Sequence, residues 1–373
     1  MAAGSGVTAG PGGTTTGPAR AALSVVASGL ANPRQLSVSS SGVVYVAEAG
    51  NGGQSACTKP TSGGRGICVG PTGSIGRISG GRAVPVVSGL PSVSSAGGAN
   101  ASGPADVVVS GSTVGFVIQD TDIGPSGANQ FGTLGRALGR LVVTDTAGKQ
   151  LRVSADFGRY EATHNPDGGA GASAASAIES DPYGLVAYRG GYAVVDAAGN
   201  DLLWVDSKGA VHLLAVFPTQ TAKSASANGA SAPVTAQSVP TSVAVGPDGA
   251  LYVGELTGAP FKVGSARVWR VVPGSAPTVY ASGFTSISGI AFDRSGRLLV
   301  LEINRLGLSQ PTGDGELIRV NADRSRTVLV SRELRSPTGV AVGPDGSIYI
   351  SNYGSSPSTG AAPHGEILRL ALA

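Results

Sequence analysis

One phrase recurs along the chain: a proline or small residue, a short apolar strand, a turn, a second strand and, in five of six copies, an acidic residue. The clearest copies are VPTSVAVGPDGALYVGE (residues 239–255) and SPTGVAVGPDGSIYISN (residues 336–352). Looser copies occupy residues 32–48, 103–120, 181–196 and 286–302. A repeat of this length is typical of folds built from stacked or radially arranged units.

Each copy predicts an antiparallel strand pair. Val243 and Val245 alternate with small residues, and the turn Gly-Pro-Asp-Gly follows. Pro247 favours one turn dihedral and Gly249 can adopt a positive φ, so the chain reverses here. The following Leu-Tyr-Val run is rich in residues that favour strands. The phrase is therefore a hairpin.

Further strands follow most copies, at residues 200–217, 266–284 and 315–330. Four short strands per unit are typical of a propeller blade. The sequence thus predicts an all-β fold, a six-bladed β-propeller of four-stranded antiparallel blades. A solenoid with open ends is the less favoured alternative.

The two ends of the repeat predict how the ring closes. After the sixth copy one more strand fits, at residues 365–373, and residues 22–30 precede the first copy without a blade of their own. We therefore expect the N-terminal strand to complete the last blade, which removes exposed strand edges. Residues 21–373 are predicted to form a single propeller domain, and the Gly/Thr/Pro-rich residues 1–20 a disordered tail.

Charge and hydropathy argue against several partner classes. The formal net charge is +3 and the 26 basic residues form no run, so nucleic-acid binding is not expected. No apolar stretch approaches the ~18 residues that a membrane span requires. We expect a monomer without a membrane span.

The only two cysteines, Cys57 and Cys68, stand in one glycine-rich insertion. They predict a disulfide, and with it an oxidising location, extracellular or in the cell envelope. The alternatives are two free thiols in a reducing compartment, or a metal pair without the CxxC spacing or nearby histidine that would complete it. No signal peptide is evident at residues 1–20, which have neither a basic start nor an apolar core.

Several motifs occur together along the chain, beside the cysteine pair. They are EAGNGG (48–53), GPTGSIGRI (70–78), SGLPS (88–92), SGPADV (102–107), LGRLV (138–142), NPDGG (165–169), DPYGL (181–185), AGNDLLWV (198–205), LAVFP (214–218) and VGELTGAPFKVGSARVWRVVPG (253–274). As a set they resemble the ScyD/ScyE family, bacterial proteins named after a scytonemin biosynthesis cluster. The resemblance implies an exported β-propeller akin to NHL-repeat and SMP-30/gluconolactonase-like propellers, with no established activity.

The residues that end the second strands form the candidate site. The inner strand of a blade starts at one face, here called the top, and the second strand returns to it. We therefore expect these residues to form a ring near the upper mouth of the channel, beneath the long insertions. They are Glu48, Asp120, Asp196, Glu255, Glu302 and Asn352.

Clustered carboxylates raise one another's pKa unless a cation or a basic partner is present. An oxygen-rich ring suits calcium or magnesium better than zinc or copper, and Ca²⁺ is the candidate cofactor. The alternative is that each acid accepts backbone N–H bonds or pairs with Arg34, Arg77, Arg136 or Arg140.

The sequence matches two classes of propeller enzyme only in part. Gluconolactonase-like propellers hold a divalent ion with an Asn near the start of an inner strand. The equivalent positions here carry other residues: Arg34, Ala105, Tyr183, Thr241, Ser288 and Thr338. Quinone-dependent sugar dehydrogenases use a histidine base, and the chain has only His164, His212 and His364. His212 falls in a predicted outer strand, and no catalytic triad or phosphate loop is found.

The sequence therefore favours a non-catalytic binding module. Its loop-rich, acidic top face would hold a small polar ligand, a glycan or a protein. Aromatic residues in or near the predicted top loops could anchor such a ligand: Phe131, Tyr160, Tyr183, Phe261 and Tyr353. A metal-dependent hydrolase or lactonase, or a sugar-dehydrogenase-like enzyme, is the alternative.

Overall fold

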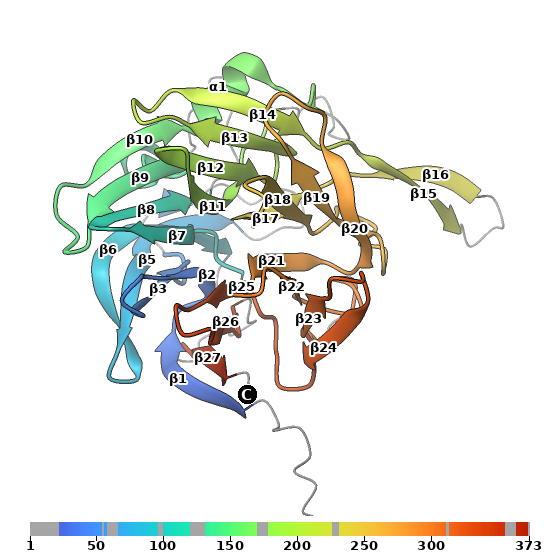
Figure 1. Cartoon of the computed structure of the whole chain (residues 1–373). Coiled ribbons are helices and arrows are strands. Elements are labelled where there is room, and N and C mark those ends of the chain that lie inside the picture. Colours follow the sequence, from blue (N-terminus) through green and yellow to red (C-terminus); the bar gives the residue numbers. More distant parts are fainter. Residues whose placement is uncertain are drawn as a thin grey trace, which may run out of the picture.

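The computed structural model describes residues 22–53, 56–57, 66–95, 100–119, 131–169, 178–225, 231–310, 313–354 and 363–371. Six antiparallel sheets are arranged around a central axis as the blades of a β-propeller (Figure 1). The predicted fold class is thereby confirmed. The predicted N-terminal tail, residues 1–20, lies outside the described residues.

Each blade contains four strands in sequence order from the axis outward, except the last. Blade 1 comprises β2 (Pro33–Val38), β3 (Val44–Glu48), β5 (Ile67–Ser79) and β6 (Arg82–Ser95), with β4 (Ala56–Cys57) added against β5. Blade 2 comprises β7 (Pro104–Ser110), β8 (Thr113–Ile118), β9 (Arg140–Asp145) and β10 (Arg152–Asp156). Blade 3 comprises β11 (Pro182–Tyr188), β12 (Gly191–Asp196), β13 (Asp201–Val205) and β14 (Val211–Val216).

The second half of the ring follows the same plan. Blade 4 comprises β17 (Pro240–Val245), β18 (Leu251–Glu255), β19 (Ala266–Val271) and β20 (Thr278–Phe284). Blade 5 comprises β21 (Ile287–Phe292), β22 (Leu298–Glu302), β23 (Glu316–Val320) and β24 (Arg326–Val330). Blade 6 comprises β25 (Gly339–Val342), β26 (Ile348–Asn352), β27 (Gly365–Ala371) and β1 (Ala22–Leu30).

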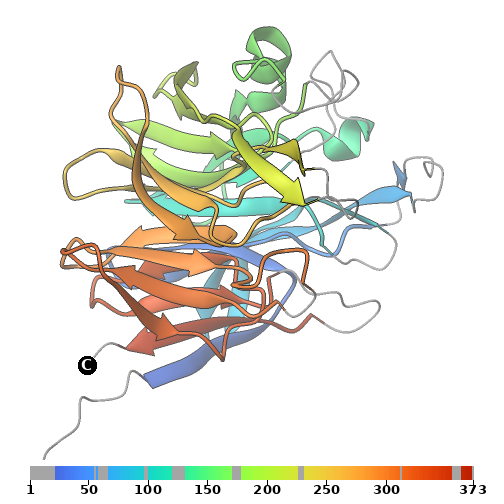
Figure 2. The same cartoon turned by 90° about the vertical axis from the view of Figure 1, so that its right-hand side faces the viewer.

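The N-terminal strand closes the ring, as the sequence predicts. β1 pairs antiparallel with β27 from Ala22 opposite Ala371 to Leu30 opposite Gly365. Figure 2 shows the two strands side by side along the outside of the last blade. Inner strands β25 and β2 also lie next to each other, so the first and last blades meet at the axis as well.

Turn chemistry explains why the repeated phrase forms hairpins. In blade 4, Gly249 adopts φ +75°, which a residue with a Cβ rarely adopts. Its N–H donates to Gly246 O at 2.9 Å, and Gly246 N–H donates to Ala250 O at 2.8 Å. The Asp248 carboxyl accepts from Ala250 N–H at 3.2 Å. The turn is therefore specified by its own residues.

The core lies between neighbouring blades. Successive side chains along a strand point to opposite faces of its sheet. Each blade therefore presents apolar side chains to the blades on both sides of it. One cluster joins blades 4 and 5 through buried Val268, Phe284, Ile290 and Val300. Polar strands would not pack in this way, which explains the short apolar runs in the sequence.

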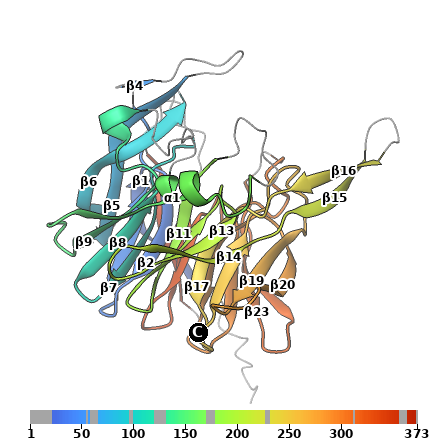
Figure 3. The ribbon, with the colours of Figure 1, turned by 90° about the horizontal axis from the view of Figure 1, so that it is seen from above.

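Four elements depart from the plain repeat: a helix, a short strand, a hairpin and a 3₁₀ helix. Figure 3 shows helix α1 (Phe157–His164), β4 and the hairpin of β15 (Gln220–Ala225) and β16 (Ser231–Ala236) on one side of the ring. The side chain of Asp156 caps α1 by accepting from Arg159 N–H at 3.0 Å, and Asn165 ends the helix in the left-handed region. A short 3₁₀ helix, η1, spans Gly132–Gly135.

The predicted disulfide is present. Cys57 and Cys68 are bonded and lie opposite each other in the β4–β5 pair. No helix within the described residues is both long enough and apolar enough to cross a membrane.

The disulfide predicts a thiol count. Protein purified without reductant and denatured in the presence of a thiol reagent should release no free thiol, because both cysteines of the chain are used. Prior reduction should give two thiols and supplies the control. A count near two without reduction would contradict the bond.

Candidate functional site

The described residues of the predicted ring all end second strands. Glu48, Asp196, Glu255, Glu302 and Asn352 are the last residues of β3, β12, β18, β22 and β26, and all five are buried. Asp120 lies outside the described residues.

These side chains share one local role. Each accepts a hydrogen bond from the segment that leads into its own blade. The Glu48 carboxyl accepts from Ala31 N–H at 2.8 Å, and the Glu302 carboxyl accepts from Thr285 N–H at the same distance. Asn352 Oδ1 accepts from Arg335 N–H at 2.7 Å. The hydrogen bonds fix the start of the inner strand relative to the end of the second strand.

Asp196 is satisfied most completely by the backbone. Its Oδ1 accepts from the N–H groups of Asp181, Ala198 and Gly199 at 2.6, 3.2 and 2.9 Å. Its Oδ2 accepts from Ser180 Oγ at 2.5 Å. Burial nevertheless raises the pKa of Asp196 above its usual value.

Glu255 is the most heavily bonded member. Its carboxyl accepts from Ser238 Oγ at 2.6 Å, Gln220 Nε2 at 3.0 Å and Trp269 Nε1 at 2.9 Å. Arg267 donates through both Nε, at 2.5 Å, and Nη2, at 3.1 Å. A side chain with no exposed surface thus holds together the hairpin β15–β16 and blade 4.

The hydrogen bonds agree with the alternative stated from the sequence, in which the ring residues accept backbone N–H bonds. Among the described residues, no group of three or more His, Cys, Asp or Glu side chains is arranged to hold a metal ion. A calcium ion at the ring stays a prediction.

The inner-strand positions that lack the lactonase-type Asn have a structural role instead. Thr241 Oγ1 donates to Ile287 O at 2.6 Å, Ser288 Oγ to Pro337 O at 2.9 Å, and Thr338 Oγ1 to Pro33 O at 2.7 Å. Each bond joins one blade to the next. Three of the six blade junctions are therefore tied at the same level of the channel.

Blade 1 reaches further across the axis. Gln35 Nε2 donates to Ser288 O of blade 5 at 2.6 Å. Buried Arg34 donates to Ala101 O at 2.6 Å and to Gly354 O. Both long side chains therefore bind backbone carbonyls outside their own blade. From the sequence, Arg34 was considered as the replacement for a ligand and as a partner of the ring acids; its bonds to backbone carbonyls were missed.

One ring residue does line a pocket. A pocket of about 580 Å³ between blades 4 and 5 is bordered by Thr285, Glu302 and Glu316. Glu302 is only 4% exposed, and among the described residues its carboxyl receives one hydrogen bond, from Thr285 N–H. Glu316 lies directly opposite Glu302 in the β22–β23 pair. Two carboxyl groups therefore share one wall.

Three arginines border the same pocket. Arg326 donates to Gly283 O at 2.9 Å and stacks on the Phe284 ring at 3.8 Å, so its guanidinium is positioned. Arg305 lies 4.0 Å from Asp314. The exposed guanidinium of Arg332 makes no hydrogen bond or ion pair within the described part of the chain. The pocket thus combines opposite charges.

The electrostatics of the pocket centre on Glu302. Burial, assisted by the neighbouring Glu316, raises the pKa of Glu302 from 4.5 to about 7, against the opposing effects of the Thr285 hydrogen bond and Arg326. Glu302 therefore exchanges its proton close to neutral pH.

This raised pKa predicts a pH-dependent stability. The folded protein holds the Glu302 proton up to about pH 7, whereas the unfolded chain loses it near pH 4.5, so the unfolding free energy falls between these values and stays lower above them. Glu302→Gln removes this loss. Urea unfolding of both proteins at pH 5 and pH 8 should show the variant gaining up to about 3 kcal/mol relative to the native chain between the two conditions. An equal difference at both pH values would contradict the assignment.

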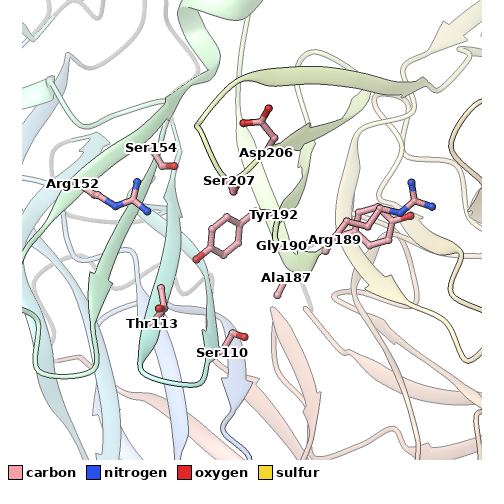
Figure 4. Close-up of a pocket in the computed structure, with 12 residues that line it drawn as sticks. Ser110, Thr113, Arg152, Ser154, Ala187, Arg189, Gly190, Tyr192, Asp206 and Ser207 are labelled. Atoms are coloured by element: carbon pink, nitrogen blue, oxygen red, sulfur yellow. The ribbon is translucent and has the colours of Figure 1, made fainter.

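Two of the other cavities border blade 2. Figure 4 shows a pocket of about 490 Å³ between blades 2 and 3, in which the Tyr192 ring stands near Arg152, Thr113 and Asp206. Asp206 is already engaged by His212 and backbone N–H groups, which lower its pKa. A groove of about 1020 Å³ between β6 and blade 2 has a largely apolar lining that includes Leu134, Leu151 and Val153.

One of the three histidines has the position predicted from the sequence. His212 lies in the outer strand β14, as expected, and its Nε2 is 3.1 Å from Asp206 Oδ2. His164 ends α1 and stacks on Tyr160 with ring centroids 4.3 Å apart. His364 meets Tyr353 edge to face at 5.4 Å. None of these contacts resembles a nucleophile–base pair.

Comparisons with known proteins agree with the architecture. A glucose dehydrogenase matches with a TM-score of 0.53 and 14% identity, covering 94% of this chain and all of its own. The soluble aldose sugar dehydrogenase of Escherichia coli, in its apo form, matches with a TM-score of 0.51 and 13% identity, over 95% of this chain and 100% of the other. A calcium-binding regucalcin from Agrobacterium tumefaciens matches with a TM-score of 0.49 and 14% identity, over 92% and 90%.

Identities this low show the fold alone. No protein-family profile matches the chain, and no curated protein matches it in sequence. The chain shares the β-propeller architecture of the two dehydrogenase structures.

Proposed function

We propose that this β-propeller is a binding module that takes a small polar ligand between blades 4 and 5, at the acidic face predicted from the sequence. The observation that carries the proposal is Glu302, a buried carboxyl with a pKa of about 7 on the wall of a 580 Å³ pocket. Structural carboxyls are normally satisfied by several donors, as Glu255 is. Glu302 retains capacity for a ligand.

The pocket chemistry defines the ligand class. Guanidinium groups bind carboxylates through paired, charge-assisted hydrogen bonds, and Arg332 is available for such a bond. Glu302 and Glu316 can accept hydrogen bonds from hydroxyl or ammonium groups. A small molecule with one carboxylate and several hydroxyl or amino groups, such as a sugar acid or an amino acid, fits this arrangement.

The test is a thermal-shift screen followed by calorimetry. The panel comprises sugar acids, hydroxy acids, amino acids and matched neutral sugars at 10 mM, a condition chosen as about the weakest affinity worth detecting. Any hit should bind at least about tenfold more weakly to Arg332→Ala, since a hydrogen bond to a charged group contributes ~1.5–3 kcal/mol. Arg189→Ala, in the pocket between blades 2 and 3, is the matched control and should bind normally. Ligands that bind the native protein and Arg332→Ala with equal affinity would contradict this site.

A catalytic function is the second candidate, favoured by one observation. A carboxyl that exchanges its proton near pH 7 is suited to general acid–base catalysis. Lactonase and dehydrogenase assays on the same panel separate the two functions. Turnover abolished by Glu302→Gln would establish an enzyme, whereas binding without turnover supports the module.

We further propose that the protein works outside the cytoplasm, in the extracellular space or the cell envelope, and that it is related to the ScyD/ScyE family. The Cys57–Cys68 bond supports an oxidising location. The motifs identified in the sequence support the family relationship. Intermediate sequences that carry these motifs and align with a recognised family member over most of the chain would test it.

A further inference from the structure

A second group of acidic side chains lies outside the ligand pocket, where α1 packs over blade 3. Glu161 comes from α1, Asp201 is the first residue of β13, and Asp196 lies opposite Asp201 in the β12–β13 pair. Asp167 follows α1 in the NPDGG motif. Three motifs singled out from the sequence, NPDGG, DPYGL and AGNDLLWV, meet here through the contacts of Asp167, Asp196 and Asn200.

Two members of this acidic group have no hydrogen-bond donor in the part of the chain that the structure describes. Asp201 is completely buried, and neither of its carboxyl oxygens has a hydrogen-bond donor among the described residues. Glu161 is 3% exposed, and within the described ranges its side chain also receives no hydrogen bond. By contrast, Asp196 has four donors, and Asp167 accepts from Asn200 Nδ2 at 2.9 Å and from Gly169 N–H at 2.7 Å.

The acidic side chains of this group lie close to one another. A methyl group added at Gly199 would stand 3.4 Å from both Glu161 Oε2 and Asp196 Cγ, so these two carboxyls converge on the same loop. The charged neighbours that act on Asp201 are Asp196, Glu161 and Asp167, and Tyr160 lies near Asp201 and Glu161. All are acidic. Burial and this mutual repulsion raise the pKa of Glu161 to about 8.

Buried like charges without a basic partner are unfavourable unless a proton or a cation neutralises them. We propose that the carboxyl groups of Glu161 and Asp201, between α1 and β13, bind a divalent cation. Among the described residues, no three His, Cys, Asp or Glu side chains are arranged to hold a metal ion, so the proposed site has two carboxylate ligands only. Calcium commonly completes its coordination with backbone carbonyl oxygens and water, so two carboxylates suffice as anchors. The site is separate from the predicted channel ring, because neither anchor belongs to that ring.

Chelator-treated full-length protein titrated with CaCl₂ at pH 8, by calorimetry and by thermal shift, tests the proposal. We expect one Ca²⁺ per chain and a rise in melting temperature. Asp201→Asn and Glu161→Gln should each weaken binding at least tenfold. Both variants remove repulsion and should fold at least as stably as the metal-free native protein, so lost binding would not reflect unfolding.

Asp106→Asn removes a fully buried carboxyl in blade 2, outside the ring and the ligand pocket, and serves as the matched control, with Ca²⁺ binding expected to be unchanged. Absence of binding heat and of a thermal shift at 10 mM Ca²⁺ and at 10 mM Mg²⁺ would overturn the proposal. So would binding that survives both Asp201→Asn and Glu161→Gln, or that is lost only in Glu255→Gln, since the ion would then lie elsewhere. These outcomes are independent of the ligand screen, which reports on the pocket between blades 4 and 5.

Discussion

Replacing Glu255 by glutamine should lower the free energy of unfolding by about 3 kcal/mol, the scale of breaking a buried ion pair. The Glu255 side chain has no exposed surface and receives donors from Gln220, Ser238, Arg267 and Trp269. An amide cannot replace the charge, and Arg267, whose side chain is 17% exposed, would keep a partly buried cation without its carboxylate. Urea unfolding at pH 8 measures the effect.

Glu302→Gln is the matched comparison. Both residues end the second strand of their blade, and both are buried. Glu302 accepts one hydrogen bond, whereas Glu255 accepts from five donor atoms. Glu302 has the acidic neighbour Glu316, whereas Glu255 forms an ion pair with Arg267. We expect its replacement to be neutral or stabilising at pH 8. Equal losses in the two variants would show that strand position, and not the partners, determines the contribution.

Removing the closing strand should have the second large effect. A chain lacking residues 2–30 loses β1, so the N–H and C=O groups of β27 that pair with it become an exposed edge. It also loses Ala27 and Leu30, which are 1% exposed in the core that includes Leu36, Val46 and Ile367. We expect a lower melting temperature and concentration-dependent association, measured by calorimetry and by size-exclusion chromatography with light scattering.

Removing residues 2–20 is the control, since the described structure begins at Ala22. That variant should melt like the full chain. A synthetic peptide with the sequence of residues 22–30 should partly restore the melting temperature of the shorter variant by adding a strand to β27. An unchanged melting temperature after deletion of residues 2–30 would contradict closure by β1.

The blades could be predicted because their information is local. Turn residues such as Pro247 and Gly249 and the alternation of the flanking strands lie within one short phrase, and copies of that phrase can be counted. Closure by β1 followed from the strand left over at each end. The cysteine pair was equally local, since both residues stand in one insertion.

The elements outside the repeat were missed for different reasons. Helix α1 has an Asp156 cap and an Asn165 stop, but it is too short for a clear helical period. The hairpin β15–β16 carries few apolar residues, although the Asn-Gly pair at 228–229 in the sequence is a strong hairpin signal. Both elements add to the same side of the ring, where insertions were expected.

The sites depend on contacts that the sequence does not encode locally. Position in the repeat selected Glu302, but only the three-dimensional arrangement brings it beside Glu316 and Arg326. The repeat did not identify Glu161 and Asp201, because neither residue ends a second strand. Their proximity arises from α1 folding over blade 3, so long-range packing and not the phrase decides it.

The most direct measurement of the proposed function is a crystal structure of the protein with the tightest-binding small carboxylate from the screen. We expect ordered ligand density in the pocket between blades 4 and 5, with the ligand carboxylate within 3.2 Å of an arginine that borders the pocket and a hydroxyl or amino group within the same distance of Glu302 or Glu316. Ligand density confined to the pocket lined by Tyr192 and Arg152, or to the groove beside β6, would contradict the account.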